Sequence, residues 1–183
     1  MGSFKDRMNR MTVTGTSQQG AVKVTFSKAT GFQFTIAPKA IEALDADQMS
    51  HEATTAFSRA LEGMRKGIGI ARNGEPPPKT LPVRRSTDPP LTPREEFAYA
   101  VAGIDVTGSS AGGLVKVNWH SEWDATVMVK SAAMNRFDAQ ELADALHQAS
   151  QQAMQARGNA LTPLIKQTFQ ARMNRRPGHG DRG

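Results

Sequence analysis

The sequence predicts an α+β protein made of two tandem modules, each with a helix, a three-stranded antiparallel sheet and a long helix. Three observations predict this fold: an internal repeat, runs of alternating apolar and polar residues, and matched helix starts. The repeat has a constant offset of 93 residues and gives 13 identities over positions 13–60. Two copies are too few for a solenoid. We therefore expect a pseudo-symmetric pair, that is, a pseudo-dimer.

Three runs in each copy alternate as half-buried strands do. The clearest run is Val-Lys-Val at 22–24, repeated at 115–117, with two valines on one face and a lysine on the other. Turns with Gly, Ser and Gln separate the first two runs of each copy, so we expect an antiparallel meander. The predicted strands are 12–17, 21–27 and 32–36 in the first copy and 105–110, 114–120 and 125–129 in the second.

A long helix follows the sheet in each copy, and both helices begin with the same signal. Asp45 precedes Gln48 by three residues, as Asp138 precedes Glu141. This spacing is a variant of the capping box. Small apolar residues then recur at helical spacing, which predicts a face that packs in the core. They are Met49, Ala53, Ala56, Ala60 and Gly63 in the first copy, and Leu142, Leu146, Ala149, Ala153 and Ala156 in the second.

The remaining segments complete the domain organisation. Thr92-Pro93-Arg94-Glu95 predicts a helix start directly before the second copy, and residues 5–11 predict a shorter equivalent before the first. Six prolines between 76 and 90 predict an extended linker. Thr162-Pro163 predicts a separate last helix that ends near Arg175. The predicted parts are a first module (1–72), a Pro-rich linker (73–92), a second module (93–160), an extra C-terminal helix (161–176) and a disordered tail (177–183).

Composition narrows the class of protein. The chain has 183 residues and no cysteine, which excludes disulfides and thiolate chemistry. It has no apolar run of membrane-spanning length and no signal-peptide core near its start, so we expect a cytoplasmic protein without membrane association. The net charge of +6 favours an acidic partner such as nucleic acid. The surplus is uneven, because residues 94–157 are net −3 and residues 158–183 are net +4.

Several short motifs resemble catalytic or ligand-binding signatures, and each has a simpler interpretation. Residues 108–112 match G-x-S-x-G, but a strand follows where the nucleophile elbow needs a helix, which favours a hairpin turn. His51-Glu52 lacks the second histidine of a zinc motif. The glycines at 63, 67 and 69 lack a phosphate-binding lysine, and a frayed helix end explains them. We therefore predict no enzyme, no metal and no cofactor.

The basic residues are the remaining candidates for function. Flexible basic segments suit contact with phosphates, which positions a protein without reading sequence. Lys23 and Lys116 face solvent on predicted strands, where a lysine is also an ordinary solvated or edge-blocking residue. Arginines near a helix C-terminus also offset its dipole. The candidate DNA-contacting residues are Lys23, Lys116, Arg84, Arg85, Arg172, Arg175 and Arg176.

The string at 107–117, a glycine-bearing turn followed by Gly-Leu-Val-Lys-Val, resembles the central signature of the YbaB/EbfC family of bacterial nucleoid-associated proteins. Residues 20–24 carry a degenerate form, and the Val-Thr-Gly before each turn is similar to actinobacterial members. The resemblance implies a helix, a three-stranded sheet and a long helix that assemble as a homodimer. It also implies that the dimer coats DNA with little sequence preference. Lys23 and Lys116 are carried over only as motif positions.

Two hypotheses of function follow. The first is a cytoplasmic, nucleoid-associated protein that binds double-stranded DNA through phosphate contacts. The second is a scaffold or accessory factor for another protein, as YbaB-like proteins associated with type VII secretion are, without DNA binding. The acidic body of the second copy favours the second hypothesis, and the basic tail favours the first. The sequence leaves open whether the halves pair within one chain or between two chains.

Overall fold

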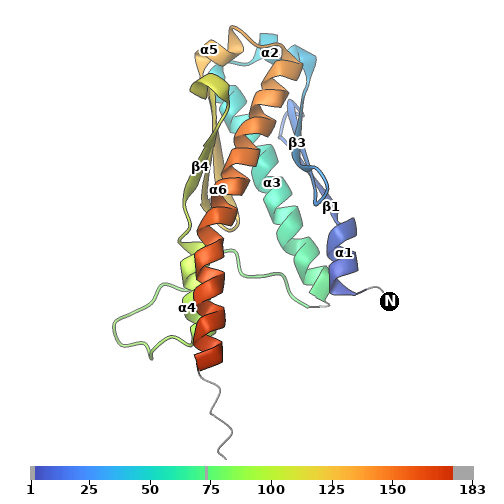
Figure 1. Cartoon of the computed structure of the whole chain (residues 1–183). Helices are drawn as coiled ribbons and strands as arrows, with labels where there is room; N and C mark the ends of the chain where they lie inside the picture. Colours follow the sequence, from blue (N-terminus) through green and yellow to red (C-terminus); the bar gives the residue numbers. More distant parts are fainter. Residues whose placement is uncertain (1–2, 73, 175–183) are drawn as a thin grey trace, which may run out of the picture.

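The computed structural model describes residues 3–72 and 74–174, and within them two halves with the same order of elements (Figure 1). The first half contains α1 (Phe4–Arg10), β1 (Thr12–Thr16), β2 (Val22–Ser27), β3 (Gly31–Ile36), α2 (Pro38–Ala43) and α3 (Ala46–Arg72). The second half contains α4 (Pro93–Ala102), β4 (Val106–Ser109), the one-turn helix η1 (Ala111–Gly113), β5 (Val115–Ser121), β6 (Asp124–Val129), α5 (Ser131–Met134) and α6 (Ala139–Asn174).

The six predicted strands are confirmed, and they form two antiparallel meanders with the orders β1-β2-β3 and β4-β5-β6. The valines at 22, 24, 115 and 117 are fully buried, as the alternating pattern predicts. Lys23 is exposed, and Lys116 is half-buried on the equivalent face. The register is also shared, because Gly15 pairs with Val24 and Gly108 pairs with Val117.

The turn between the first two strands of each half is held by a buried serine. The backbone N–H of Val22 donates to Ser17 Oγ at 3.0 Å, and that of Val115 donates to Ser110 Oγ at the same distance. In the second half, Gly112 and Gly113 have positive φ values of 74° and 64°, which an L side chain rarely adopts. The predicted hairpin turn at residues 108–112 is therefore confirmed.

The predicted helix starts are confirmed in atomic detail. Asp45 Oδ1 accepts from the N–H of Gln48 at 2.8 Å, and Gln48 Oε1 accepts from the N–H of Asp45 at 3.0 Å. Asp138 and Glu141 make the same two bonds before α6. Thr92 and Glu95 form a full capping box before α4. The sequence analysis did not predict α2 and α5, which are too short for a clear hydrophobic period.

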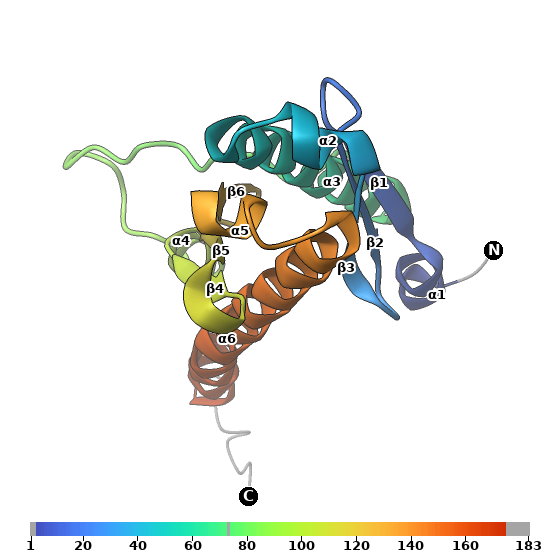
Figure 2. The same cartoon turned by 90° about the horizontal axis from the view of Figure 1, so that it is seen from above.

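Each long helix packs against both sheets. Helix α3 contacts β1 of its own half and β6 of the other, and α6 contacts β4 of its own half and β3 of the other. Seen from above, the sheets lie on opposite sides of the helix pair (Figure 2). Their inner faces meet at Phe32 and Trp119, whose ring centroids lie 5.8 Å apart. Phe57 of α3 lies 4.6 Å from the Phe32 ring and 5.8 Å from that of Trp119. The two halves therefore share one core.

The helix side chains also cover the strand edges between the halves. Thr54 Oγ1 accepts from the N–H of Val127 at 2.9 Å, and Ser50 Oγ accepts from that of Val129 at 2.8 Å. On the other side, α6 covers the edge of β3 in the same way. His147 Nδ1 lies 2.6 Å from the carbonyl oxygen of Phe32, and because a carbonyl can only accept, His147 carries a proton on Nδ1 in this hydrogen bond. These contacts satisfy backbone groups that an open sheet edge would leave free to pair with another chain.

Two expectations about the helices are wrong. Gly63, Gly67 and Gly69 lie inside α3 rather than at a frayed end, because their missing side chains leave room for close neighbours. A Cβ at Gly67 would meet Met11 Sδ at 2.5 Å, and one at Gly69 would meet the backbone nitrogen of Pro76 at 2.7 Å.

The predicted separate helix from residue 161 is the other error, because α6 continues through Pro163. The hydroxyl of Thr162 donates to the carbonyl of Gly158 at 3.0 Å instead of capping a new helix. Pro163 removes one helix hydrogen bond, but Pro163 and Asn159 are exposed, so water can satisfy the free carbonyl. Contacts between α4 and α6, close to Leu164 and Thr168, hold the later turns in line.

Candidate nucleic-acid interface

The helices and turns gather at two opposite ends of the molecule (Figure 1). We call the end formed by α2, α5 and the first turns of α3 and α6 the tip. We call the end formed by α1, α4, residues 74–92 and the last turns of α3 and α6 the base. Strands β2 and β5 begin near the tip, where Ala37 and Lys130 bond to the carbonyls of Ala21 and Leu114, and they run toward the base.

Acidic residues gather at the tip. They lie in α2 and in the first turns of the two long helices, where carboxylates stabilise the positive end of a helix dipole. The acidic residues here are Glu42, Asp45, Asp47, Asp138, Glu141 and Asp144, against the basic residues Lys39, Lys130 and Arg136. This end therefore repels a polyanion such as DNA.

Basic residues gather at the base. They come from α1, the last turns of α3 and α6, α4, the β2–β3 turn and the linker. They are Lys5, Arg7, Arg10, Lys28, Arg65, Lys66, Arg72, Lys79, Arg84, Arg85, Arg94 and Lys166. The carboxylates of the same regions are fewer, and they are Asp6, Glu62, Glu75, Asp88, Glu95 and Glu96. The base therefore presents a surplus of positive charge.

Only part of this positive charge is neutralised internally. Arg65 donates two hydrogen bonds to Glu62, at 2.8 and 2.9 Å, and these bonds hold the pKa of that carboxyl below its usual value. In the described part of the chain, no carboxylate lies within ion-pair distance of Lys5, Arg10 or Arg72. The Arg72 guanidinium instead lies 5.7 Å from the ring centroid of Phe4. These cations are therefore available to an external anion.

The structure separates the two sheet lysines from the base and from each other. Lys23 and Lys116 lie on the outward faces of different sheets, which point in opposite directions (Figure 2). Both residues are near the start of their strands, on the side of the tip. One straight duplex at the base would therefore not reach either lysine.

The predicted arginines divide between the linker and the chain end. Arg84 donates to the carbonyl of Pro89, and the N–H of Arg85 donates to Asp88 Oδ2 at 2.7 Å. Both belong to the base. Arg172 lies in the last turn of α6, and Arg175 and Arg176 fall outside the described residues.

Sequence reasoning missed the basic residues of α1 and of the end of α3. Three of the seven residues in α1 are basic, and none of its residues is buried. Three cations in one short exposed helix are a signal of a binding surface. Net charges summed over whole segments of the sequence hide this local cluster. The structure adds Lys66 and Arg72, because α1 lies against α3 and brings both sets to one surface.

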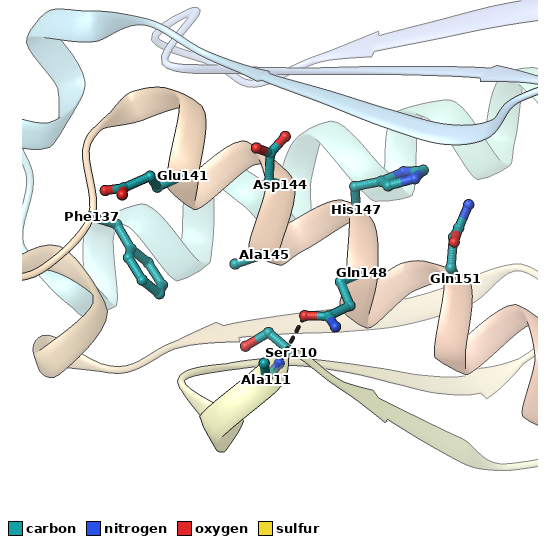
Figure 3. A pocket seen from close by; sticks show the side chains of 9 residues that line it. All are labelled: Ser110, Ala111, Phe137, Glu141, Asp144, Ala145, His147, Gln148 and Gln151. Atoms are coloured by element: carbon teal, nitrogen blue, oxygen red, sulfur yellow. Dashed lines mark hydrogen bonds between the residues drawn. The ribbon is translucent and has the colours of Figure 1, made fainter.

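A pocket of about 490 Å³ near the tip is lined by Ser110, Asp144 and His147, the residue types of a hydrolase triad (Figure 3). The Ser110 hydroxyl is the buried turn acceptor for Val115, and the His147 ring points away from it toward β3. Gln148 accepts from the N–H of Ala111 at 2.8 Å and closes the nearby turn. The three residues therefore form no nucleophile-base pair. Among residues 3–72 and 74–174, no cluster of His, Asp and Glu has the makings of a metal site.

The base therefore presents exposed cations, of which Lys5, Arg10 and Arg72 have no carboxylate partner in the described part of the chain. Residues 1–68 match the model of the YbaB/EbfC DNA-binding family. The matched segment covers α1, the first sheet and most of α3, and so includes Lys5, Arg10 and Lys66. No curated protein and no solved structure matches the chain significantly. None of the described helices has the length and apolar character to cross a lipid bilayer.

Proposed function

We propose that this protein is a nucleoid-associated protein that binds double-stranded DNA with little sequence preference, and that it grips the duplex at the base. The observation that carries the proposal is that residues 1–68, which match a DNA-binding family, also supply the exposed cations Lys5 and Arg10 of α1 and the exposed Lys66 of α3, whose ammonium lies 3.7 Å from Glu62 Oε1. Lysine and arginine contacts to phosphates give affinity without reading bases. Because the tip is acidic, it repels the phosphates of DNA, so the protein should approach a duplex with its base.

The chain is proposed to be a tandem duplication that forms an intramolecular pseudo-dimer. Supporting observations are the constant offset of the repeat and the reciprocal packing of each long helix on both sheets. The edge-covering bonds of Thr54 and His147 to the opposite half also support it. One chain then provides the body that two chains provide in a homodimer.

The grip of the base is electrostatic and therefore sensitive to salt. Each phosphate that a cation contacts releases a counterion, so the logarithm of the binding constant falls with the logarithm of the salt concentration by about 0.9 per contact. Removing three contacting cations should therefore reduce this slope by about 3. The loss of affinity should be the same for all DNA sequences, since no base contact is removed.

The experiment compares full-length variants on a random-sequence duplex across a salt series. The first variant replaces Lys5, Arg10 and Lys66 of the base by alanine. The matched control removes the same charge at the tip, by replacing Lys39, Lys130 and Arg136. We expect the first variant to bind more weakly with a smaller slope, and the control to bind as the unmodified protein does.

Two further variants locate the rest of the grip. One replaces Lys23 and Lys116, and the other replaces Arg84, Arg85, Arg172, Arg175 and Arg176. We expect the arginine variant to lose affinity and the sheet-lysine variant to retain it. Equal losses in the base and tip variants would contradict a localised grip. If the unmodified protein fails to bind duplex even at low salt, DNA binding is refuted and protein partners become the target.

A further inference from the structure

A large cavity lies at the base, away from the exposed cations of α1. Its volume is about 910 Å³, and it lies between the linker, α4, the end of α3 and the turn from β5 to β6. Pockets for small ligands in proteins have volumes of roughly 300–1,000 Å³. The cavity is therefore large enough for an organic molecule.

The linker is fixed over this cavity by specific contacts. Gly69 allows the linker to approach α3 closely at Pro76. Arg65 donates to the carbonyl of Pro77 at 2.5 Å, and the Tyr99 hydroxyl of α4 donates to that of Pro82 at 2.6 Å. Prolines restrict the backbone further. The linker thus forms a preorganised wall of the cavity.

The lining of the cavity is mainly apolar, with positive charge added. Apolar side chains from all four surrounding segments contribute, among them Ile68, Leu81, Phe97 and Trp123. Four cations, Arg72, Lys79, Arg84 and Arg94, also line it, against the single carboxylate of Glu122. Charge complementarity therefore favours a ligand with an apolar body and a negative group.

Trp123 belongs to the wall and is only 6% exposed. Its indole N–H is buried and has no hydrogen-bond partner in the described part of the chain. Buried donors in folded proteins are usually paired with an acceptor of the protein or of ordered water. An unpaired donor in the wall of an apolar cavity is the kind of group that a bound polar atom satisfies.

We propose that this cavity binds a small anionic amphiphile, with an apolar chain packed against Phe97 and the Trp123 ring, and with a carboxylate that lies among the four cations and accepts from the Trp123 indole N–H. The site shares Arg72, Lys79, Arg84 and Arg94 with the base, whereas the cations of α1 do not line it. A free phosphate carries the same charge without the apolar body, so it distinguishes anion binding alone from recognition of an amphiphile.

The test uses the two tryptophans as native reporters, with a brominated undecanoate as the probe and quencher. Trp123 lines the cavity and Trp119 lies in the core, so bound probe should quench mainly Trp123. We expect saturable quenching in the full-length protein. The methyl ester, which lacks the charge, should bind about tenfold more weakly, as should a variant with Arg84→Ala and Arg94→Ala. Inorganic phosphate should not displace the probe.

Two variants identify the site of quenching. Trp123→Phe should abolish the saturable signal, while Ala98→Leu, which fills the cavity from α4, should keep the fluorescence and lose the quenching. A control with Lys39→Ala and Lys130→Ala at the tip should respond as the unmodified protein does. Quenching that does not saturate, or that persists in Ala98→Leu, would overturn the proposal. Displacement of the probe by inorganic phosphate would also overturn it.

Discussion

The sharpest prediction concerns Gly15, where β1 approaches the backbone of α3. A Cβ at this position would lie 2.1 Å from the carbonyl oxygen of Ala56 and 2.5 Å from the backbone nitrogen of Ala60. Both neighbours are backbone atoms of a packed helix, so no side chain can rotate out of the way. The strand must instead move away by roughly 1 Å, which weakens the van der Waals contacts of the whole strand-helix interface.

We therefore expect Gly15→Ala to lower the free energy of unfolding by about 3 kcal/mol or more, at the upper end of typical overpacking costs. The equivalent Gly108 would place its Cβ 2.0 Å from the carbonyl oxygen of Ala149, so Gly108→Ala should cost a similar amount. The free energy would be measured by denaturant unfolding monitored through tryptophan fluorescence and circular dichroism.

Gly158 provides a matched control with the opposite expected sign. It lies in α6, and a Cβ there would meet nothing within 4 Å. Gly158→Ala should therefore stabilise the protein by about 0.5–1 kcal/mol through helix propensity alone. If the free energy of unfolding of Gly15→Ala lies within about 0.5 kcal/mol of that of the unmodified protein, then β1 and α3 do not approach this closely in the folded molecule.

Three other predictions test the contacts between elements. Thr54→Val should lower the free energy of unfolding by about 1–3 kcal/mol, because it leaves the N–H of Val127 unpaired. The control Thr55→Val should change it little, because the Thr55 side chain makes no hydrogen bond in the described part of the chain. Denaturant unfolding and amide exchange at Val127 measure both variants. Arg157 is buried, its guanidinium lies 5.4 Å from the Trp119 ring centroid, and it donates to the carbonyl of Ile104 at 3.2 Å. Arg157→Ala should cost about 2–4 kcal/mol in unfolding, and Arg157→Met, which copies Met64 of the first half, should cost less. Hydrogen bonds from Thr92 lower the pKa of Glu95. Because the pKa of Glu95 is lower in the folded protein than in the unfolded chain, its ionised form stabilises the fold, and this stabilisation is lost as the pH falls below about 4. The protection factors of amides near the start of α4, which correct for the intrinsic slowing of exchange in acid, should therefore fall there in the unmodified protein but not in Glu95→Gln.

The parts of this fold that the sequence predicts are those set by neighbouring residues. The strand containing Lys23 is readable because burial alternates along it with a period of two. The start of α3 is readable because Asp45 and Gln48 bond to each other's backbone across three residues. Such signals depend on nothing distant in the chain. They therefore hold in whatever tertiary arrangement the halves adopt.

The errors arise where a distant contact decides the local structure. Glycine is a poor helix residue, but α3 continues through Gly67, because the missing side chain lets Met11 pack against the helix there. Pro163 is typical of a helix start, but α4 supports the turns on both of its sides. The surface proposed to bind DNA likewise depends on contacts between distant segments. The cations of α1 and of the α3 end form one patch only because α1 packs along α3, and segment charges do not reveal that.

The two copies keep identical residues where backbones approach, but the cations at the end of α3 are not repeated in the second copy. Gly15, Ala56 and Ala60 have identical counterparts in the second half, whereas Arg65, Lys66 and Arg72 correspond to Gly158, Asn159 and Ile165. The core is thus pseudo-symmetric while the positive charge is not. A homodimer would present two equal ends to DNA. If this chain binds DNA as proposed, the first half carries more of the cations, so we expect an asymmetric footprint on a duplex, with the α1 side making most of the phosphate contacts.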